Sequence, residues 1–600
     1  MKLSLPLTVS LASMSSFLPS CFGEYIYLEG QPDGLFSLKP ADPGMTLYNY
    51  ETWKKANETD PEGRFKRQYS QSYEDRVVTT GIISKGDDDD DILLLPKHKE
   101  YERFEKQINE LEFMSVDFDY TATKMAGTKK NMTKALEETS TDGIVVLWKG
   151  EIVYEKYFNF TCGGKECEPK FSASTPHNIK SCTKSYVGLM VSMLILEGKI
   201  DETKTIGEYI EELNEPGGAF KEKTVRQVLD MTAQFTYMEG GLGEDENGTY
   251  FFPATCDITN DANWATYFEK LWRDDVTQVG IKMPNQRNCE QLHDFNAAWP
   301  LREPPEVWRN RTGNRFVRYP GAQNHRDGLL PLKDNDYPND KYFVYRTANT
   351  LVLAWLVEKI TGVDPKDHFS KELWSKIGAS RDAGIWTDSP GGFAYFGGGV
   401  SVTARDAARF GHMMNNDGQN AFNHQVIPKE IIDDIKRGGT DENRLQFGQT
   451  SVPTNNFWYN CFAATTEMKT QGCFVDPQQS KDLPSIQYLK TMGVDLEKDP
   501  YPSGFFSYRN QYWVAQDHLF FQQGIYGQYV AVFPKIDLVI AKFSSSVEEN
   551  DQIFPNLSLL WAFADKFAAE SDETKKSVGC SCLPTLFGHL LLLAISYIYL

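Results

Sequence analysis

The sequence predicts a mixed α/β (α+β) fold with one antiparallel sheet built from both ends of the folded chain and helices in between. Two hairpin patterns predict the sheet: residues 143–158 form two apolar runs joined at Lys149-Gly150, and residues 524–546 form two more around Pro534-Lys535. A buried helix is predicted at residues 181–197, and a second helix is predicted with Asn349 as its N-cap and Gly362 just past its end. Strands at both ends of a chain favour helices that pack on a shared sheet or form a second lobe.

The start of the chain predicts an exported protein. Residues 1–23 contain one lysine, a short apolar core and then small residues, which is typical of a secretory signal peptide cleaved between Ser20 and Glu24. Asn-x-Ser/Thr sequons agree with this compartment, because they are N-glycosylation acceptors in secreted proteins. The expected glycan sites are Asn57, Asn131, Asn159, Asn247, Asn310 and Asn556.

The end of the chain predicts a lipid anchor. Residues 571–600 contain small residues, a spacer and an apolar tail that stops at the last residue, which is typical of a GPI-attachment signal. Ser577 is the expected anchor site, with Ser571 and Gly579 as alternatives. A tail-anchor helix is the alternative for the whole segment. The two ends together predict an extracellular protein, held at the cell surface by its GPI anchor or secreted.

The cysteines fit an oxidising compartment. Three pairs are close along the chain, although spacing alone does not fix disulfide connectivity. These pairs are Cys162 with Cys167, Cys256 with Cys289, and Cys461 with Cys473. Cys182, at the start of the buried helix, is expected to be a free core thiol.

The charge balance excludes one class of partners. The chain has 62 Lys and Arg against 83 Asp and Glu, a formal net charge of −21, which opposes binding to nucleic acid and to anionic membrane surfaces. Membrane contact is therefore expected through the lipid anchor only. The nine histidines form no metal-ligand spacing, so the sequence predicts neither a metal site nor a cofactor.

Composition divides the exported chain into two parts. Residues 24–135 form a polar and aromatic N-terminal extension, which ends in an amphipathic helical pattern over residues 97–114. Its five consecutive aspartates, 87–91, are expected to form a solvated loop, because a calcium site needs spaced oxygen ligands. Residues 136–570 carry both hairpins and the helical patterns, and are expected to form the main domain.

A Ser-x-x-Lys motif stands at the start of the predicted buried helix. Ser181 and Lys184 are three residues apart, so their side chains lie on one helix face. A serine hydroxyl becomes a nucleophile when a base takes its proton, and a lysine can be that base when burial keeps its amine neutral. The free N–H groups of a helix start would stabilise an oxyanion. The motif therefore predicts a serine nucleophile with a lysine base; the alternative is an ordinary helix cap.

Further blocks accompany this motif in a fixed order. They are residues 175–201, 222–233, 343–362, 373–386, 396–411, 507–514 and 524–545. Together they resemble the serine β-lactamase/penicillin-binding-protein superfamily, most closely its class C-like esterases and 6-aminohexanoate-dimer (nylon-oligomer) hydrolases. The resemblance covers residues 142–546. It implies a transpeptidase-like antiparallel sheet flanked by helices, an inserted all-helical lobe, and an active site between the two.

The resemblance implies roles for individual residues. Ser181 matches the family's nucleophile, Lys184 its base partner, and Tyr345 the tyrosine of the second motif, which assists proton transfer. Thr347 stands where most relatives have asparagine. The backbone N–H groups of Ser181 and of Ile525, the latter expected on an edge strand, match the oxyanion hole.

The third motif departs from that of the β-lactamases. In place of Lys-Thr-Gly this chain has Gly524-Ile525-Tyr526-Gly527, where nylon-oligomer hydrolases carry Gly-Ile-His-Gly. The missing lysine argues against β-lactam or D-Ala-D-Ala substrates, because that cation helps to hold their carboxylate. The expected activity is hydrolysis of a small-molecule or peptide-like amide or ester through an acyl-enzyme. The alternative is a non-catalytic, glycosylated cell-surface binding module on the same scaffold.

Overall fold

The structure is a computed structural model, and the main part of the chain is described from residue 80 to residue 571 with gaps. The described residues are 68, 80–86, 94–119, 124–159, 161–162, 165–166, 170–236, 243–244, 250–251, 326, 329–330, 332–334, 339–340, 343, 345–387, 392–439, 482–494, 506–515, 517–546 and 553–571.

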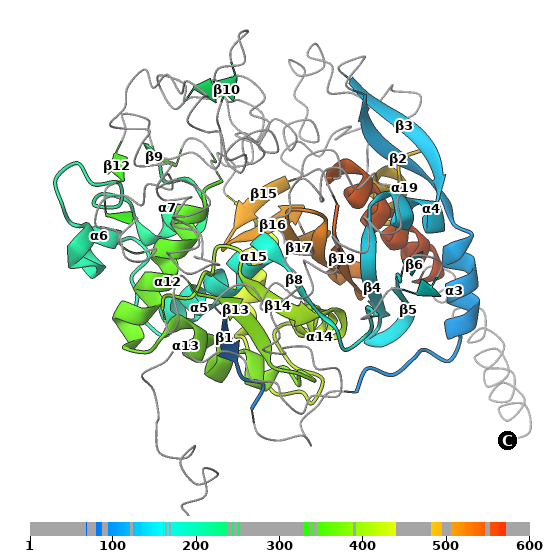
Figure 1. The fold of residues 1–600 in the computed structure, drawn as a ribbon, viewed down its shortest axis with the longest axis horizontal. Helices are drawn as coiled ribbons and strands as arrows, with labels where there is room; N and C mark the ends of the chain where they lie inside the picture. The colour runs from blue at the N-terminus through cyan, green and yellow to red at the C-terminus, as the bar shows by residue number, and fades with distance from the viewer. Residues whose placement is uncertain are drawn as a thin grey trace, which may run out of the picture.

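A seven-stranded antiparallel sheet forms the centre of the molecule, in the order β15-β16-β17-β18-β19-β4-β5 (Figure 1). Its strands are β4 (Thr141–Trp148), β5 (Glu151–Tyr157), β15 (Phe506–Arg509), β16 (Tyr512–Ala515), β17 (Leu519–Gly524), β18 (Gln528–Phe533) and β19 (Leu538–Ser544). The two predicted hairpins lie side by side, because β19 pairs with β4. The prediction of one antiparallel sheet built from both ends of the chain is confirmed.

Helices cover both faces of this sheet. In β4, Val145 and Leu147 belong to the hydrophobic cluster that includes α5 (Lys184–Leu196) and α14 (Ala404–Asn415). Ile144 and Val146 belong to the cluster that includes the helix over residues 553–571. Successive side chains of a strand point to opposite faces, so a strand covered on both faces is apolar along its whole length. This explains the unbroken burial of β4.

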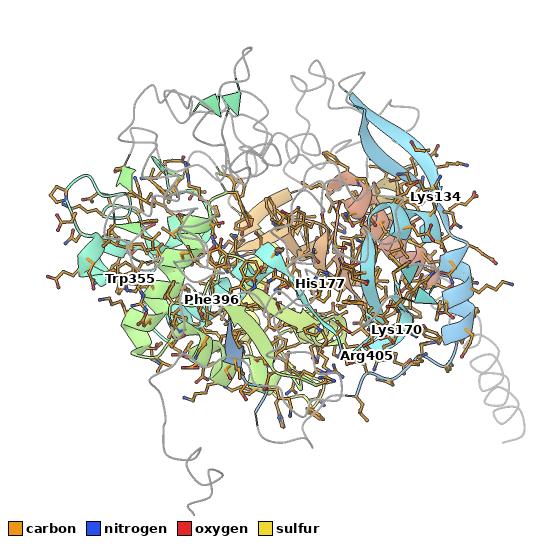
Figure 2. The ribbon with its side chains drawn as sticks, viewed as in Figure 1. Lys134, Lys170, His177, Trp355, Phe396 and Arg405 are labelled. Atoms are coloured by element: carbon orange, nitrogen blue, oxygen red, sulfur yellow. The ribbon has the colours of Figure 1, made fainter. Side chains whose placement is uncertain are left out.

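A group of helices lies beyond one end of the sheet. Its longest member carries Trp355, which is labelled in Figure 2. The group comprises α6 (Ile206–Tyr209), α7 (Val225–Leu229), α12 (Thr347–Thr361) and α13 (Pro365–Glu372). It corresponds to the expected helical lobe, and α12 packs on both α5 and α7. Gly362 ends α12 in the left-handed conformation, as predicted. The N-cap is Arg346 rather than Asn349, so the helix begins three residues earlier than expected, and Asn349 is buried in its first turn.

A smaller four-stranded antiparallel sheet leads the chain to the Ser-x-x-Lys motif. It has the order β1-β13-β14-β8, with β1 (Thr80–Ile83), β8 (Pro176–Asn178), β13 (Ala383–Trp386) and β14 (Val400–Thr403). Strand β8 ends three residues before Ser181. Strand β1 comes from the predicted N-terminal extension, so that part of the extension is built into the main domain.

The rest of the described extension packs on the face of the large sheet to which Ile144 and Val146 belong. It forms α3 (Tyr101–Asn109), β2 (Glu112–Asp119), β3 (Lys124–Asn131) and α4 (Met132–Glu138). The predicted helix over residues 97–114 is therefore shorter than expected, because the chain from Glu112 pairs with β3 instead. Shorter elements complete the described part: β6 (Thr161–Cys162), β7 (Lys165–Glu166), β9 (Phe235–Thr236), β10 (Gly243–Glu244), β11 (Tyr250–Phe251), β12 (Lys333–Asp334), α15 (Lys429–Arg437) and α19 (Pro484–Thr491).

The structure corrects one predicted glycan site. Asn556 is fully buried in the helix over residues 553–571, so the folded chain has no room for a glycan on its amide, and that prediction is wrong. Asn131 caps α4, and Asn159 hydrogen-bonds both the N–H and the carbonyl of Phe171. Both stay predictions, and the other three sequons, Asn57, Asn247 and Asn310, lie outside the described residues.

The predicted signal peptide, residues 1–23, and residues 572–600 of the predicted tail, with Ser577, also lie outside the described residues. Within the described ranges, no helix combines the length and the apolar character that a membrane span requires. Cys182 is a buried free thiol, as predicted. The side chains of the predicted disulfides are not among those described.

Candidate active site

Ser181 and Lys184 meet at the start of the central helix. A 3₁₀ turn, η5 (Lys180–Thr183), runs directly into α5 at Lys184. Residues i and i+3 of a 3₁₀ turn are stacked along its axis, which places the lysine over the serine. Lys184 Nζ donates a hydrogen bond to Ser181 Oγ over 3.0 Å. The local backbone therefore brings the two side chains of the motif into direct contact.

The amine of Lys184 is fixed by further groups from the surrounding structure. Its side chain is 1% exposed, and Nζ also donates a hydrogen bond to the carbonyl of Gly397. The centroid of the Tyr345 ring lies 5.1 Å from Nζ. Burial removes water from the amine, which is the condition under which a lysine can act as a base.

Three consecutive glycines let the backbone come this close to Lys184. A Cβ at residue 397 would lie 2.5 Å from Cγ2 of Thr347, and one at residue 399 would lie 2.8 Å from the carbonyl oxygen of Tyr395. A side chain at either position would push this segment away from its neighbours. Sequence reasoning missed Gly397 as a site residue, because a carbonyl ligand leaves no trace in the side-chain pattern. The glycine run itself was the available signal.

Tyr345 stands between the helical group and the large sheet. It lies two residues before the start of α12, and its ring stacks on Trp513 of β16 with centroids 5.8 Å apart and planes 17° apart. Tyr508 of β15 contacts the same ring edge-on at 6.2 Å. These aromatic neighbours fix the ring beside Lys184. The structure therefore places the ring of Tyr345 beside Lys184, the residue with which the resemblance groups it.

Ile525 is the first residue of the turn between β17 and β18. Strand β17 lies between β16 and β18, so the prediction of an edge-strand N–H is wrong. Strand β16 pairs only with residues 519–521 of β17, and the turn that contains Ile525 extends beyond this pairing. A Cβ at Gly524 would lie 2.3 Å from the carbonyl oxygen of Ile179, so the turn packs directly on the backbone that precedes Ser181. Among the described residues, the N–H of Ile525 has no hydrogen-bond acceptor.

A second buried lysine adjoins the serine, and sequence reasoning did not find it. Lys180 is 3% exposed and has a positive φ of 49°, which is uncommon for a residue with a side chain. Its Nζ lies 4.6 Å from the ring centroid of Trp386 and 5.9 Å from that of Tyr526. The site therefore has a buried lysine amine on each side of Ser181 along the chain. The only sequence signal was a lysine immediately before the motif.

The helix that carries the motif is fixed against the β15–β16 turn. A Cβ at Gly188 would lie 2.0 Å from the carbonyl oxygen of Asn510, so only glycine permits this approach. The hydroxyl of Ser185 donates to the carbonyl of Gln511 over 2.7 Å. The position of Ser181 relative to the sheet therefore depends on contacts more than 300 residues away in the sequence. In the described ranges, no cluster of His, Cys, Asp or Glu is arranged to hold a metal ion.

Comparison with known proteins identifies the family. The sequence model of the Beta-lactamase family matches residues 129–310 and 324–557. The chain belongs to the Beta-lactamase family. The 6-aminohexanoate-dimer hydrolase of Paenarthrobacter ureafaciens is 31% identical over 337 residues, which are 56% of this chain and 66% of that enzyme. The match thus spans just under two thirds of the relative's length.

A solved structure agrees with the fold. It belongs to a protein from Bacillus anthracis that is provisionally assigned as a 6-aminohexanoate-dimer hydrolase. The two chains are 22% identical, with a TM-score of 0.54, and the match covers 88% of this chain and 97% of the other. This similarity supports the predicted β-lactamase/transpeptidase-like architecture of antiparallel sheets and helices.

Proposed function

We propose that the protein is a serine hydrolase that cleaves an amide or ester through an acyl-enzyme on Ser181. The observation that carries this proposal is the 3.0 Å hydrogen bond between Lys184 Nζ and Ser181 Oγ, made by a lysine that is almost completely buried. A base within hydrogen-bond distance of the hydroxyl is the geometric requirement for an activated serine. Family membership supports hydrolase activity over the alternative of a non-catalytic binding module.

Each part of the site has a role in the proposed reaction. Ser181 Oγ attacks the carbonyl carbon while the neutral amine of Lys184 accepts its proton. The N–H groups of Ser181 and Ile525 stabilise the oxyanion of the tetrahedral intermediate. The leaving group departs with a proton from Lys184, with Tyr345 beside it assisting the transfer. Water, deprotonated by the same groups, then releases the acid and restores the serine.

An amide is the first substrate class to test. The relative in Paenarthrobacter ureafaciens is named for the dimer of 6-aminohexanoate, whose two units are joined by an amide bond. The same attack on a carbonyl would cleave an ester, which has a better leaving group. Paired amide and ester substrates with one acyl group would therefore separate the two activities, without changing the contacts to the acyl part.

A fluorophosphonate probe tests the nucleophile. The wild-type protein should be labelled, and Ser181→Ala should not. Lys184→Met keeps the length of the side chain and removes the base, so labelling should slow by at least about a hundredfold. Tyr345→Phe should slow it less if lysine is the base.

Ser192→Ala is the matched control for these variants. Ser192 lies in the same buried helix, and its hydroxyl donates to the carbonyl of Gly188 within that helix rather than to the site. This variant should be labelled at the wild-type rate once its folding is verified. A folded wild-type protein that takes no label, or a Lys184→Met protein labelled at the wild-type rate, would overturn the proposal.

We propose that this hydrolase acts outside the cell, either secreted or held at the surface by a GPI anchor near Ser577. The support is the signal-like start of the chain, the apolar tail and the remaining sequons. Phosphatidylinositol-specific phospholipase C should release the protein from intact cells. Protein that stays in the membrane after this treatment would favour a tail-anchor helix instead.

A further inference from the structure

The turn that contains Ile525 is held in a strained backbone conformation. Tyr526 has φ +65° and Gly527 has φ +92°, both in the left-handed region. A bulky residue such as tyrosine is rarely found there, and strain of this kind persists only where the surrounding structure enforces it. The groups that fix this turn therefore decide where the N–H of Ile525 points.

Gln528 connects this turn to the end of β19. Its Nε2 donates hydrogen bonds to the carbonyl of Ile525, over 3.2 Å, and to the carbonyl of Ser544. Its Oε1 accepts a hydrogen bond from the N–H of Ser544 over 3.0 Å. Gln528 is fully buried, so water cannot replace these bonds. One side chain thus bridges the two backbone segments.

The end of β19, to which Gln528 is bonded, is held by further hydrogen bonds. The N–H of Ser546 donates to the carbonyl of Tyr526 over 3.2 Å, which adds a second bond to the turn. On the other side, Ser545 Oγ donates to Asp142 of β4 over 3.1 Å. His177, seen in the centre of the molecule in Figure 2, has its Nε2 3.0 Å from the same carboxylate. The end of β19 is therefore fixed to β4.

Lys542 also belongs to this buried group. It is fully buried, and its Nζ donates a hydrogen bond to Ser544 Oγ. The backbone of Ser544 is therefore bonded to Gln528 while its hydroxyl is bonded to Lys542. None of these groups touches Ser181 in the described structure, so the mechanism above gives them no chemical role.

We propose that Gln528 is a positioning residue of this site: its amide fixes the β17–β18 turn against the end of β19 and thereby holds the N–H of Ile525 in place for the oxyanion. The inference rests on the proposed function, because it requires an oxyanion at that N–H. An oxyanion donor contributes only when it lies at hydrogen-bond distance from the developing charge. A displacement of about 1 Å can lower the rate about a hundredfold.

The test compares two buried glutamines. Gln528→Met keeps the volume of the side chain and removes all three hydrogen bonds. Gln522→Met is the matched control, because Gln522 is equally buried in β17 and donates to the hydroxyl of Tyr512 rather than to the turn. If Gln528→Met does not fold, Gln528→Glu serves instead, since a carboxylate cannot donate to the carbonyl of Ile525.

The measurements are kcat and KM for p-nitrophenyl butyrate and the affinity for phenylboronic acid, which forms a tetrahedral adduct with an active serine. For Gln528→Met we expect kcat to fall at least about tenfold with KM changed less than about threefold, and boronate affinity to fall in parallel with kcat. Gln522→Met should lose stability but keep kcat within about twofold of the wild type.

The outcomes separate the two proposals. Equal kcat in the two folded glutamine variants would overturn the positioning role while the hydrolase assignment stands. A wild-type protein that neither turns over the ester nor binds the boronate at Ser181 would overturn both. A fall in KM alone, with kcat unchanged, would also contradict the positioning role.

Discussion

Lys542 should make the stability of this protein depend on pH above neutrality. Burial lowers the pKa of its amine from 10.5 to about 7, against the opposing effect of the Asp142 charge. In the unfolded chain the amine regains its ordinary pKa, so between these two values the unfolded state binds the additional proton. The contribution of Lys542 to stability is therefore fully present only above about pH 10.5 and is lost as the pH falls towards 7.

The magnitude follows from the size of the shift. One pKa unit corresponds to about 1.4 kcal/mol, so the whole shift corresponds to about 5 kcal/mol of unfolding free energy. Lys542→Met keeps the length of the side chain and removes the titrating group. Between pH 7.5 and 9.5, the wild type should gain roughly 2–3 kcal/mol relative to this variant.

Urea unfolding at a series of pH values, followed by intrinsic fluorescence, measures this difference. The wild-type free energy of unfolding should rise with pH relative to the variant, so the difference, wild type minus variant, should increase steadily above pH 7. Parallel curves would refute the reasoning, because they would mean that the amine binds its proton equally well in the folded and the unfolded chain. A wild-type free energy of unfolding that falls with rising pH relative to the variant would contradict the sign of the shift.

Two further predictions concern the surroundings of the site. Gly188→Ala should lower the free energy of unfolding in urea by about 3 kcal/mol, because its Cβ would lie 2.0 Å from the carbonyl oxygen of Asn510. Gly198→Ala, at φ +71° with no atom within 4 Å, should lower it by about 1 kcal/mol. Equal losses would contradict the packing argument. Burial alone would raise the pKa of Asp434, but the hydrogen bonds and charge of Arg509 lower it to about 2, so Arg509→Met should destabilise the protein by about 3–5 kcal/mol at neutral pH. That loss should shrink as the pH falls from about 4 to 2, and a loss independent of pH would contradict the ion pair.

Much of the fold could be predicted from local pattern. The two hairpins were recognisable because alternation and turn residues act within a few positions, and the structure places both turns as expected, at Lys149-Gly150 and at Pro534–Ile536. The helix ending at Gly362 was recognisable for the same reason. The errors fall where distant contacts override local pattern: the predicted helix over residues 97–114 gives way to a strand at Glu112, because β3 offers it a partner.

The candidate site divides in the same way. Ser181 and Lys184 could be paired from sequence, since a spacing of three residues places both side chains on one face of a helical turn. Tyr345 and Ile525 came from the resemblance to a family; the structure places the ring of Tyr345 beside Lys184 and packs the turn of Ile525 on the backbone that precedes Ser181. Gly397 was missed, because its part in the site is a backbone carbonyl.

The sequence by itself determined the two hairpins, the buried helix, the helix that ends at Gly362 and the Ser181–Lys184 dyad, because hydrophobic period, turn residues and i,i+3 spacing are local properties of the chain. Only the tertiary structure decided what surrounds the dyad. It brings Gly397 onto Lys184, the turn of Ile525 onto the backbone before Ser181, and Gln528 onto Ser544. These contacts join segments far apart in the chain, and several of them involve backbone atoms that every residue shares. No pattern of side chains along the sequence could therefore have predicted these contacts.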